Sequence, residues 1–269
     1  MDDLRRPLAP IADDAWQAID AMASSVLRLN LAARKLVDLD GPKGWKESSV
    51  DLGRIQSIGA PPGEGVTAVV RRVQPLVELR AEFELSRAEL DDVGRGALDP
   101  DLDPVERAAQ HIARAEDRAV FHGYRDGGIA GIAEVSPLEP LQIPENYEAY
   151  PGVVAEAANR LRLAGIDGPY GIALGPRCYT GLVQATARGG YPVLEIVRQV
   201  VGGPVVWAPG VNGAIVLSTA DGHFQLTVGR DFSIGYLDHT ATTVRLYLVE
   251  SMTFRVLTPD AAVWLRYGG

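Results

Sequence analysis

Residues 244–257 carry the clearest strand pattern in the chain. Apolar side chains fill the even positions and more polar ones most of the odd positions, and the run is rich in β-branched and aromatic residues. Glu250 is the one exception, because it falls among the apolar positions. At about 3.3 Å per residue the run would span roughly 45 Å, far more than an average strand of about 5–6 residues. A strand of this length favours a flat, extended subunit over a compact globule.

A second unusual pattern lies in residues 50–73. Two strand-like runs flank a tip rich in glycine and proline, which predicts a hairpin. The second run places Val66 and Val70 on one face, and Val69 and Val73 on the other. A lone two-stranded hairpin cannot cover both of its faces. We therefore predict that this hairpin packs against another subunit; the alternative is that it folds back on its own domain.

The remainder of the chain mixes helical and strand patterns. Apolar spacing and capping residues predict helices over residues 13–34, 103–122, 151–165 and 176–187, and from residue 192 onward. Strands are predicted over residues 76–85, 170–174, 205–207 and 214–219. The Asp221-Gly222 pair predicts a hairpin between the strand of residues 214–219 and a strand over residues 223–228. The fold class is therefore α+β.

Composition narrows the possible partners. The 269 residues include 35 acidic and 26 basic ones, giving a net charge of −9, which argues against nucleic acid as a partner. A single cysteine, Cys178, allows no internal disulfide and indicates a reducing compartment. No apolar run approaches the roughly 20 residues of a membrane span, and the first residues do not form a secretory signal. We expect a cytoplasmic protein without a membrane partner.

Residues of the types that catalyse reactions or bind metals are spread along the chain without a recognisable motif. The four histidines form no metal-binding pattern, and no spacing proposes a nucleophile with its base. Cys178 is expected to be a packed structural thiol. Glu116 and Asp117 adjoin in mid-helix, so we expect one solvated and one ion-paired carboxylate rather than an acid–base couple. No catalytic residue and no metal site are predicted.

Eight collinear motifs resemble the encapsulins, bacterial shell proteins once also labelled linocin-type bacteriocins. They are LRRPLAPI at 4–11, RKLVDLDGPKGW at 34–45, ELDDVGRG at 89–96, AEDRAVFHGY at 115–124, GIDGPY at 165–170, GGYPVLE at 189–195, VGRDFSIGYLDH at 228–239 and TVRLYLVESMTFRVL at 243–257. The resemblance spans essentially the whole chain.

The resemblance implies a tailed-phage capsid fold of the Hong-Kong-97 type. In this fold residues 1–49, 76–133 and 223–269 would form a peripheral domain, residues 50–75 an extended loop, and residues 134–222 an apical domain. Members assemble into closed icosahedral cages of about sixty copies or a multiple. They enclose cargo enzymes, such as ferritin-like iron-storage proteins or dye-decolourising peroxidases, which carry a C-terminal targeting peptide.

The resemblance also implies two sites. A cargo-peptide groove would lie between the first helix and the peripheral sheet, with apolar pockets and charges that fix the register of the peptide. Its expected residues are Leu27, Leu31, Arg34, Asp38, Asp231, Ile234 and Tyr236. A pore at the fivefold axis would be lined by Arg188, Gly189, Gly190, Tyr191 and Pro192. The alternatives are that the groove residues only pack the helix on the sheet, and that the second segment is an ordinary loop.

One departure from the family concerns a cofactor. Some members stack a flavin on an aromatic residue just before Glu-Leu-Asp, where this chain has Ala88. Without an aromatic face there, we predict no bound flavin and no other cofactor. Two alternatives to an encapsulin are a phage or prophage capsid subunit and, less favoured because no catalytic pattern is present, a hydrolase.

Overall fold

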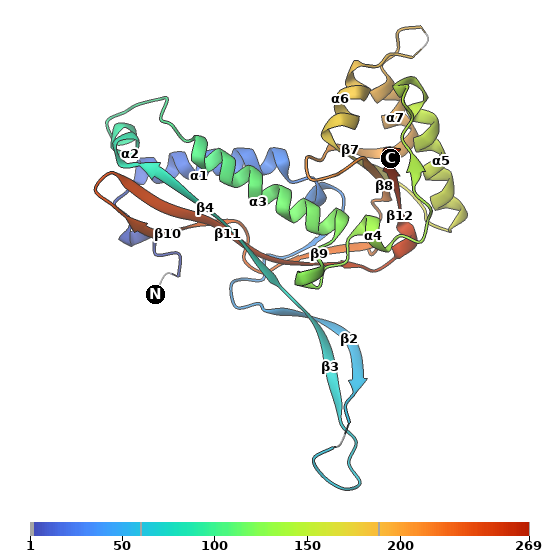
Figure 1. Cartoon of the computed structure of the whole chain (residues 1–269), viewed down its shortest axis with the longest axis horizontal. Helices are drawn as coiled ribbons and strands as arrows, with labels where there is room; N and C mark the ends of the chain where they lie inside the picture. The colour runs from blue at the N-terminus through green and yellow to red at the C-terminus, as the bar shows by residue number, and fades with distance from the viewer. Residues whose placement is uncertain (1–2, 60, 188, 269) are drawn as a thin grey trace.

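The computed structural model describes residues 3–59, 61–187 and 189–268. Two five-stranded sheets, each covered by helices, are joined side by side, and a two-stranded hairpin projects from their junction (Figure 1). This arrangement confirms the α+β class. No helix within the described ranges is long and apolar enough to cross a lipid bilayer.

The first sheet is built around its longest strand, β11 (Thr243–Val256). One edge of β11 pairs with β10 (Ser233–His239) and then with β9 (Phe224–Val228), while the other edge pairs with β4 (Val77–Ser86). The short strand β1 (Asp38–Asp40) runs parallel to β9. The predicted long strand is confirmed, and it holds three other strands in one sheet.

Two helices cover this sheet, α1 (Asp13–Asn30) and α3 (Asp103–His122). The first turn of α3 contains proline, whose fixed φ suits that position, and Gly123 ends the helix at φ +86°. The prediction for α3 is confirmed, but α1 ends at Asn30 rather than near residue 34. The chain turns after Asn30 because the buried Asp117 carboxylate accepts hydrogen bonds from the backbone N–H groups of Ala32 and Ala33.

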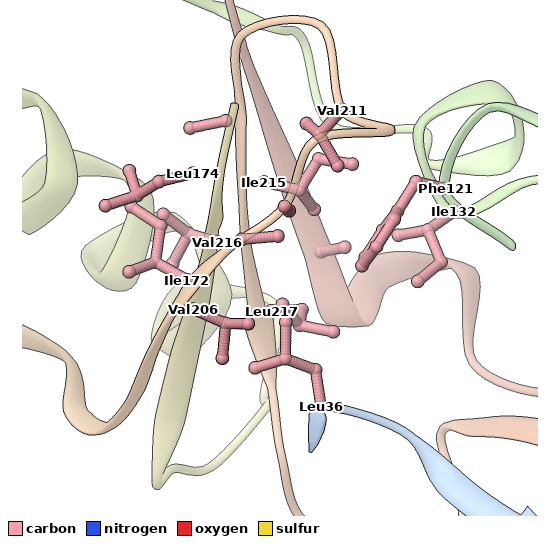
Figure 2. Close-up of a cluster of buried hydrophobic side chains, with 14 of the residues drawn as sticks. Leu36, Phe121, Ile132, Ile172, Leu174, Val206, Val211, Ile215, Val216 and Leu217 are labelled. Carbon is pink, nitrogen blue, oxygen red and sulfur yellow. The ribbon is translucent and has the colours of Figure 1, made fainter. Parts of the chain in front are cut away.

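The second sheet has the order β5-β12-β8-β6-β7. Its strands are β5 (Leu141–Gln142), β6 (Tyr170–Leu174), β7 (Gly202–Trp207), β8 (Ala214–Ser218) and β12 (Ala262–Arg266). The helices around it are α4 (Ile132–Val135), α5 (Tyr150–Leu163), α6 (Pro176–Gln184) and α7 (Val193–Val201). Its core is continuous with that of the first sheet. Figure 2 shows Leu36 close to Leu217 of β8, and Phe121 of α3 beside Ile132 of α4, all within one cluster of buried side chains.

The predicted hairpin between residues 214–219 and 223–228 is wrong. β8 lies in the second sheet, whereas β9 lies in the first and pairs with β1 and β11. The Asp221-Gly222 turn therefore carries the chain from one sheet to the other.

β12 returns to the second sheet, although the predicted division assigns residues 223–269 to the peripheral domain. That division remains a prediction.

The hairpin comprises β2 (Ser49–Ser57) and β3 (Val69–Pro75), paired antiparallel. It extends away from both sheets, and it does not fold back on its own domain (Figure 1). Val69 is 52% exposed, Val70 46% and Val73 47%, so both faces of β3 leave apolar side chains in solvent. One further short helix, α2 (Arg87–Gly94), follows β4.

Candidate functional site

A pocket lies between α1 and the first sheet. Its volume is about 270 Å³, and its walls come from the N-terminal segment, α1, β10, β11 and the loop before β10. The lining residues are Leu4, Arg6, Asp20, Ala23, Ser24, Leu27, Phe232, Ser233, Ile234 and Leu248. Two residues of the predicted groove, Leu27 and Ile234, thus lie on opposite walls of one pocket.

The sequence explains this pocket. α1 places its apolar residues on the face turned to the sheet, and its acidic first turn (Asp13, Asp14) and basic last turn (Arg28) suit the helix dipole. Small residues at positions 23 and 24 leave space between helix and sheet. At one side, Arg6 Nη2 lies 2.7 Å from Asp20 Oδ2, which ties the N-terminal segment to α1.

Next to the pocket lies a cluster of charges centred on Arg34. Its guanidinium lies 2.7 Å from Glu116, 2.9 Å from Glu250 and 2.8 Å from Asp231. Glu116 and Glu250 are fully buried, whereas the Asp231 side chain is 49% exposed. The ring of Phe232, which also lines the pocket, is 4.7 Å from the guanidinium carbon. One edge of the cluster therefore faces the pocket and solvent.

Burial and neighbouring charges shift the pKa values of Arg34, Glu250 and Asp117. Burial, and then the neighbouring Glu116, raise the pKa of Glu250 well above its ordinary value, while Arg34 opposes this shift. Burial disfavours the charge on Arg34, but Glu116, Glu250 and Asp231 together raise its pKa. Burial also raises the pKa of Asp117 to about 7, although Ala33 and Ala32 donate hydrogen bonds to its carboxylate. Glu250 Oε1 is buried without a hydrogen-bond partner.

The other predicted groove residues are placed differently. Leu31 is buried in the core beneath α1. Tyr236 is half-buried on β10, and its hydroxyl bonds to His239 Nδ1. Asp38 lies on β1, where it accepts a hydrogen bond of 2.7 Å from the Gly222 N–H. Of the seven predicted groove residues, the pocket is lined by Leu27 and Ile234. Arg34 and Asp231 lie beside it in the charge cluster, next to Phe232. The other three are not among the lining residues.

The segment predicted to line a pore joins α6 to α7 at the far tip of the second sheet's domain (Figure 1). Arg188 lies outside the described residues. Gly189 and Gly190 adopt φ of +90° and +78°, a region that favours glycine. The Ala187 N–H donates to the Tyr191 carbonyl at 2.8 Å, and Tyr191 is 47% exposed. Pro192 is exposed as well.

Several residues of this region escaped sequence reasoning. The expectation that one of Glu116 and Asp117 is solvated is wrong, because both are fully buried. The signal for the cluster was Glu250, the only charged residue among the apolar positions of the long strand. Phe232, Arg6 and Asp20 gave no pattern that separates them from other surface residues.

Other candidate chemistry is sparse. Cys178 is buried, and burial raises the pKa of its thiol, as suits a packed thiol rather than a nucleophile. Its Sγ lies 3.0 Å from the Tyr267 hydroxyl. Among the residues that the structure describes, no three acidic, histidine or cysteine side chains are grouped to hold a metal ion.

Comparison with known proteins identifies the family. The profile of a family described as "Encapsulating protein for peroxidase" matches residues 1–253. A type 1 encapsulin shell protein of Rhodospirillum rubrum is 54% identical over 99% of this chain and 97% of its own length. The chain belongs to the encapsulin shell-protein family.

The fold agrees with this membership. The crystal structure of a virus-like particle from Pyrococcus furiosus matches this encapsulin with a TM-score of 0.63, at 17% identity, over 92% of this chain and 98% of the other. Mycobacterium phage Bobi matches with a TM-score of 0.59, at 12% identity, over 89% and 91% of the two chains. The predicted capsid-like fold is confirmed. The curated members of the family that match this chain are named shell proteins.

Proposed function

We propose that this encapsulin assembles into a closed icosahedral shell of about sixty copies or a multiple, and that the β2–β3 hairpin is buried only on neighbouring copies. The observation that carries the proposal is the apolar surface of the hairpin. Ile55 is 65% exposed and Ile58 51%, and the valines of β3 add to both faces. A soluble chain rarely leaves so much apolar surface on one projecting element unless a partner covers it.

Closed symmetry gives the hairpin such a partner. In a shell each hairpin meets the same surface of the next copy, so no apolar face or strand edge remains open once the shell closes. The likeness in fold to the virus-like particle from Pyrococcus furiosus and the 54% identity to an encapsulin shell protein both support this assembly. The identity favours an encapsulin over a phage capsid subunit.

Substitution within the hairpin tests the assembly. The double variant Val69→Lys/Val73→Lys places two charges on one face of β3, where each would be desolvated in an interface. We expect this variant to remain as chains of 28.8 kDa or small oligomers in analytical ultracentrifugation, while the control Thr67→Lys, nearer the tip, forms shells. Wild-type shell yields from the double variant would refute the proposed role of the hairpin.

We further propose that the pocket between α1 and β10 binds the C-terminal targeting peptide of a cargo enzyme. Leu27, Ile234 and Phe232 offer apolar contacts in the pocket. Asp231 and Arg34 offer charges beside Phe232, just outside the lining. This combination fits a short peptide with apolar anchors and a few charged residues. The family description favours a peroxidase as cargo, and a ferritin-like iron-storage protein is the second candidate.

Two kinds of variant test the cargo pocket. Polar substitution of Leu27 and Ile234 should give shells that assemble but remain empty when cargo is co-expressed. Because both side chains are buried, Ser24→Phe provides a second variant, which fills the pocket from an exposed position. Leu29→Gln is the matched control, since Leu29 lies on the outer face of α1 and is 64% exposed. Cargo capture by Ser24→Phe shells at the control level would contradict the assignment.

We also propose that residues 188–192 surround a pore for small ions or substrates. Five exposed loops with two positive-φ glycines can approach one another closely around an axis. Replacing Tyr191 by Ala should widen the opening and speed ion uptake by loaded shells without changing assembly. An unchanged uptake rate in shells of normal size would count against this pore.

A further inference from the structure

A second pocket lies where the end of α3 meets the second sheet. Its volume is about 570 Å³, within the range of small-molecule sites. It is lined by Arg114, Arg118, His122, Pro209, Gly210, Val211, Asn212 and Trp264. No carboxylate lines this pocket, although the whole chain carries a net charge of −9.

Within the part of the chain that the structure describes, the two arginines of this pocket have no counter-ion. Arg114 and Arg118 are exposed, and no ion pair or side-chain hydrogen bond occupies either guanidinium among the described residues. Their spacing of four residues places them one above the other on the same face of α3. Like charges at this spacing repel each other, so an anion between them would relieve the repulsion.

The floor of the pocket is rigid. Asn212 is held at both ends of its backbone, because its N–H donates to His122 Nε2 at 3.1 Å and its carbonyl accepts from Trp264 Nε1 at 3.0 Å. Burial, and then the charge of Arg118, lower the pKa of His122 and favour its neutral ring. The Asn212 N–H fixes Nε2 as the acceptor of that ring. Val211 is buried in the hydrophobic core beside the second sheet (Figure 2).

Gly210 brings this loop directly onto α3. A Cβ at Gly210 would lie 2.8 Å from the Asp117 Cβ, 3.2 Å from the Arg114 carbonyl and 3.3 Å from the Arg118 nitrogen. The loop therefore passes against the backbone of α3 between the two arginines. A pocket with a fixed floor and two unpaired guanidinium groups is preorganised for an anion.

We propose that this pocket binds a phosphate group, either as inorganic phosphate or as part of a small phosphate ester. Guanidinium groups form paired N–H donors that match phosphate oxygens, and two of them balance a doubly charged anion. The rings of His122 and Trp264, with centroids 5.9 Å apart, give one wall an aromatic character that an ester with a planar base could also use. The proposal does not depend on the cargo pocket or on the pore.

The test is equilibrium dialysis of assembled shells against labelled inorganic phosphate at constant ionic strength, and against a nucleoside monophosphate in a second series. We expect saturable binding of about one phosphate per subunit. In the double variant Arg114→Gln/Arg118→Gln the affinity should fall at least about tenfold. Arg107→Gln is the control for a charge lost elsewhere, because it removes one positive charge from the same helix outside the pocket. Its affinity should stay within about twofold of wild type.

Two further results complete the test. The double variant Arg114→Lys/Arg118→Lys keeps both charges but loses the paired donors, so its affinity should be intermediate. If the glutamine variant fails to assemble, this lysine variant is compared with wild type in its place. Tighter binding of the nucleotide would identify a phosphate ester as the ligand, and weaker binding would identify free phosphate. Equal binding would show that the pocket recognises the phosphate group alone. Absence of saturable binding to wild-type shells, or equal affinity in wild type and both double variants, would overturn the proposal.

Discussion

Replacing Arg34 by methionine should destabilise the subunit more than the loss of any surface arginine. Arg34 is the only cation placed by the described residues within salt-bridge distance of either Glu116 or Glu250, and both carboxylates are fully buried. Methionine approximates the length of the arginine stem but removes its charge and its donors. Two buried acids would then share one site without a counter-ion.

The size of the effect follows from this burial. Removing one partner of a buried ion pair costs about 3–5 kcal/mol, because the remaining charge is left desolvated. In a chain of this size, a loss of 1 kcal/mol lowers the melting temperature by about 2–4 °C. We therefore expect the melting temperature of Arg34→Met to fall by roughly 6–20 °C at pH 8.

The pH dependence gives a sharper test. Without Arg34, the folded-state pKa of Glu250 rises further above its unfolded value of about 4.3, so the folded chain holds a proton there that the unfolded chain has lost. The resulting penalty is full above the folded pKa and disappears as the pH falls toward the unfolded pKa. The deficit of Arg34→Met relative to wild type should shrink between pH 8 and pH 5 in differential scanning calorimetry.

Two comparisons make this prediction refutable. Arg245→Met removes two ion pairs, with Glu82 and Asp238, but all three side chains are at least 44% exposed, so less than about 1 kcal/mol should be lost. Adding Glu250→Gln to Arg34→Met should recover part of the loss, because one buried charge is gone. Equal melting temperatures for Arg34→Met and Arg245→Met, at both pH values, would show that the buried cluster does not stabilise the fold as argued.

Two other predictions concern the core. Since burial raises the pKa of Asp117 to about 7, its contribution to stability decreases as the pH rises from about 4 to about 7. Infrared spectra of wild type minus Asp117→Asn should contain a protonated-carboxyl band at pH 5, which falls to about half near pH 7 and is lost above it. Absence of this band at pH 5 would refute the prediction. Gly131→Ala should cost about 1–3 kcal/mol, because its Cβ would lie 2.1 Å from the Gly123 nitrogen, whereas Gly152→Ala, with open space around it, should cost nothing in thermal unfolding.

The parts of the fold that sequence reasoning predicted correctly are those set by local patterns. α3 follows from its Asp-Pro start and its glycine end, and β11 from alternation over 14 residues. The end of α1 depends on Asp117, which lies 85 residues away from Ala32 in the chain, so no local signal marks it. The Asp221-Gly222 turn is real, but a turn does not reveal that the two strands beside it belong to different sheets.

The candidate site, like the fold, could be predicted from the sequence only in part. Resemblance located Leu27 and Ile234, which lie on opposite walls of the cargo pocket, and it also named Arg34 and Asp231. It did not find Glu116, because a carboxylate in mid-helix is far more often solvated than buried with an arginine from another element. Buried charge clusters arise from long-range packing, which residue patterns along one chain do not encode.

The most direct test of the central claim is hydrogen exchange of residues 49–75 in purified shells. In the isolated chain this hairpin has solvent on both faces, so its amides outside the β2–β3 ladder would exchange freely. Burial on neighbouring copies predicts strong protection of both strands in intact shells, lost together with the shell on disassembly. Intact shells in which the hairpin exchanges as fast as in separated subunits would contradict the account.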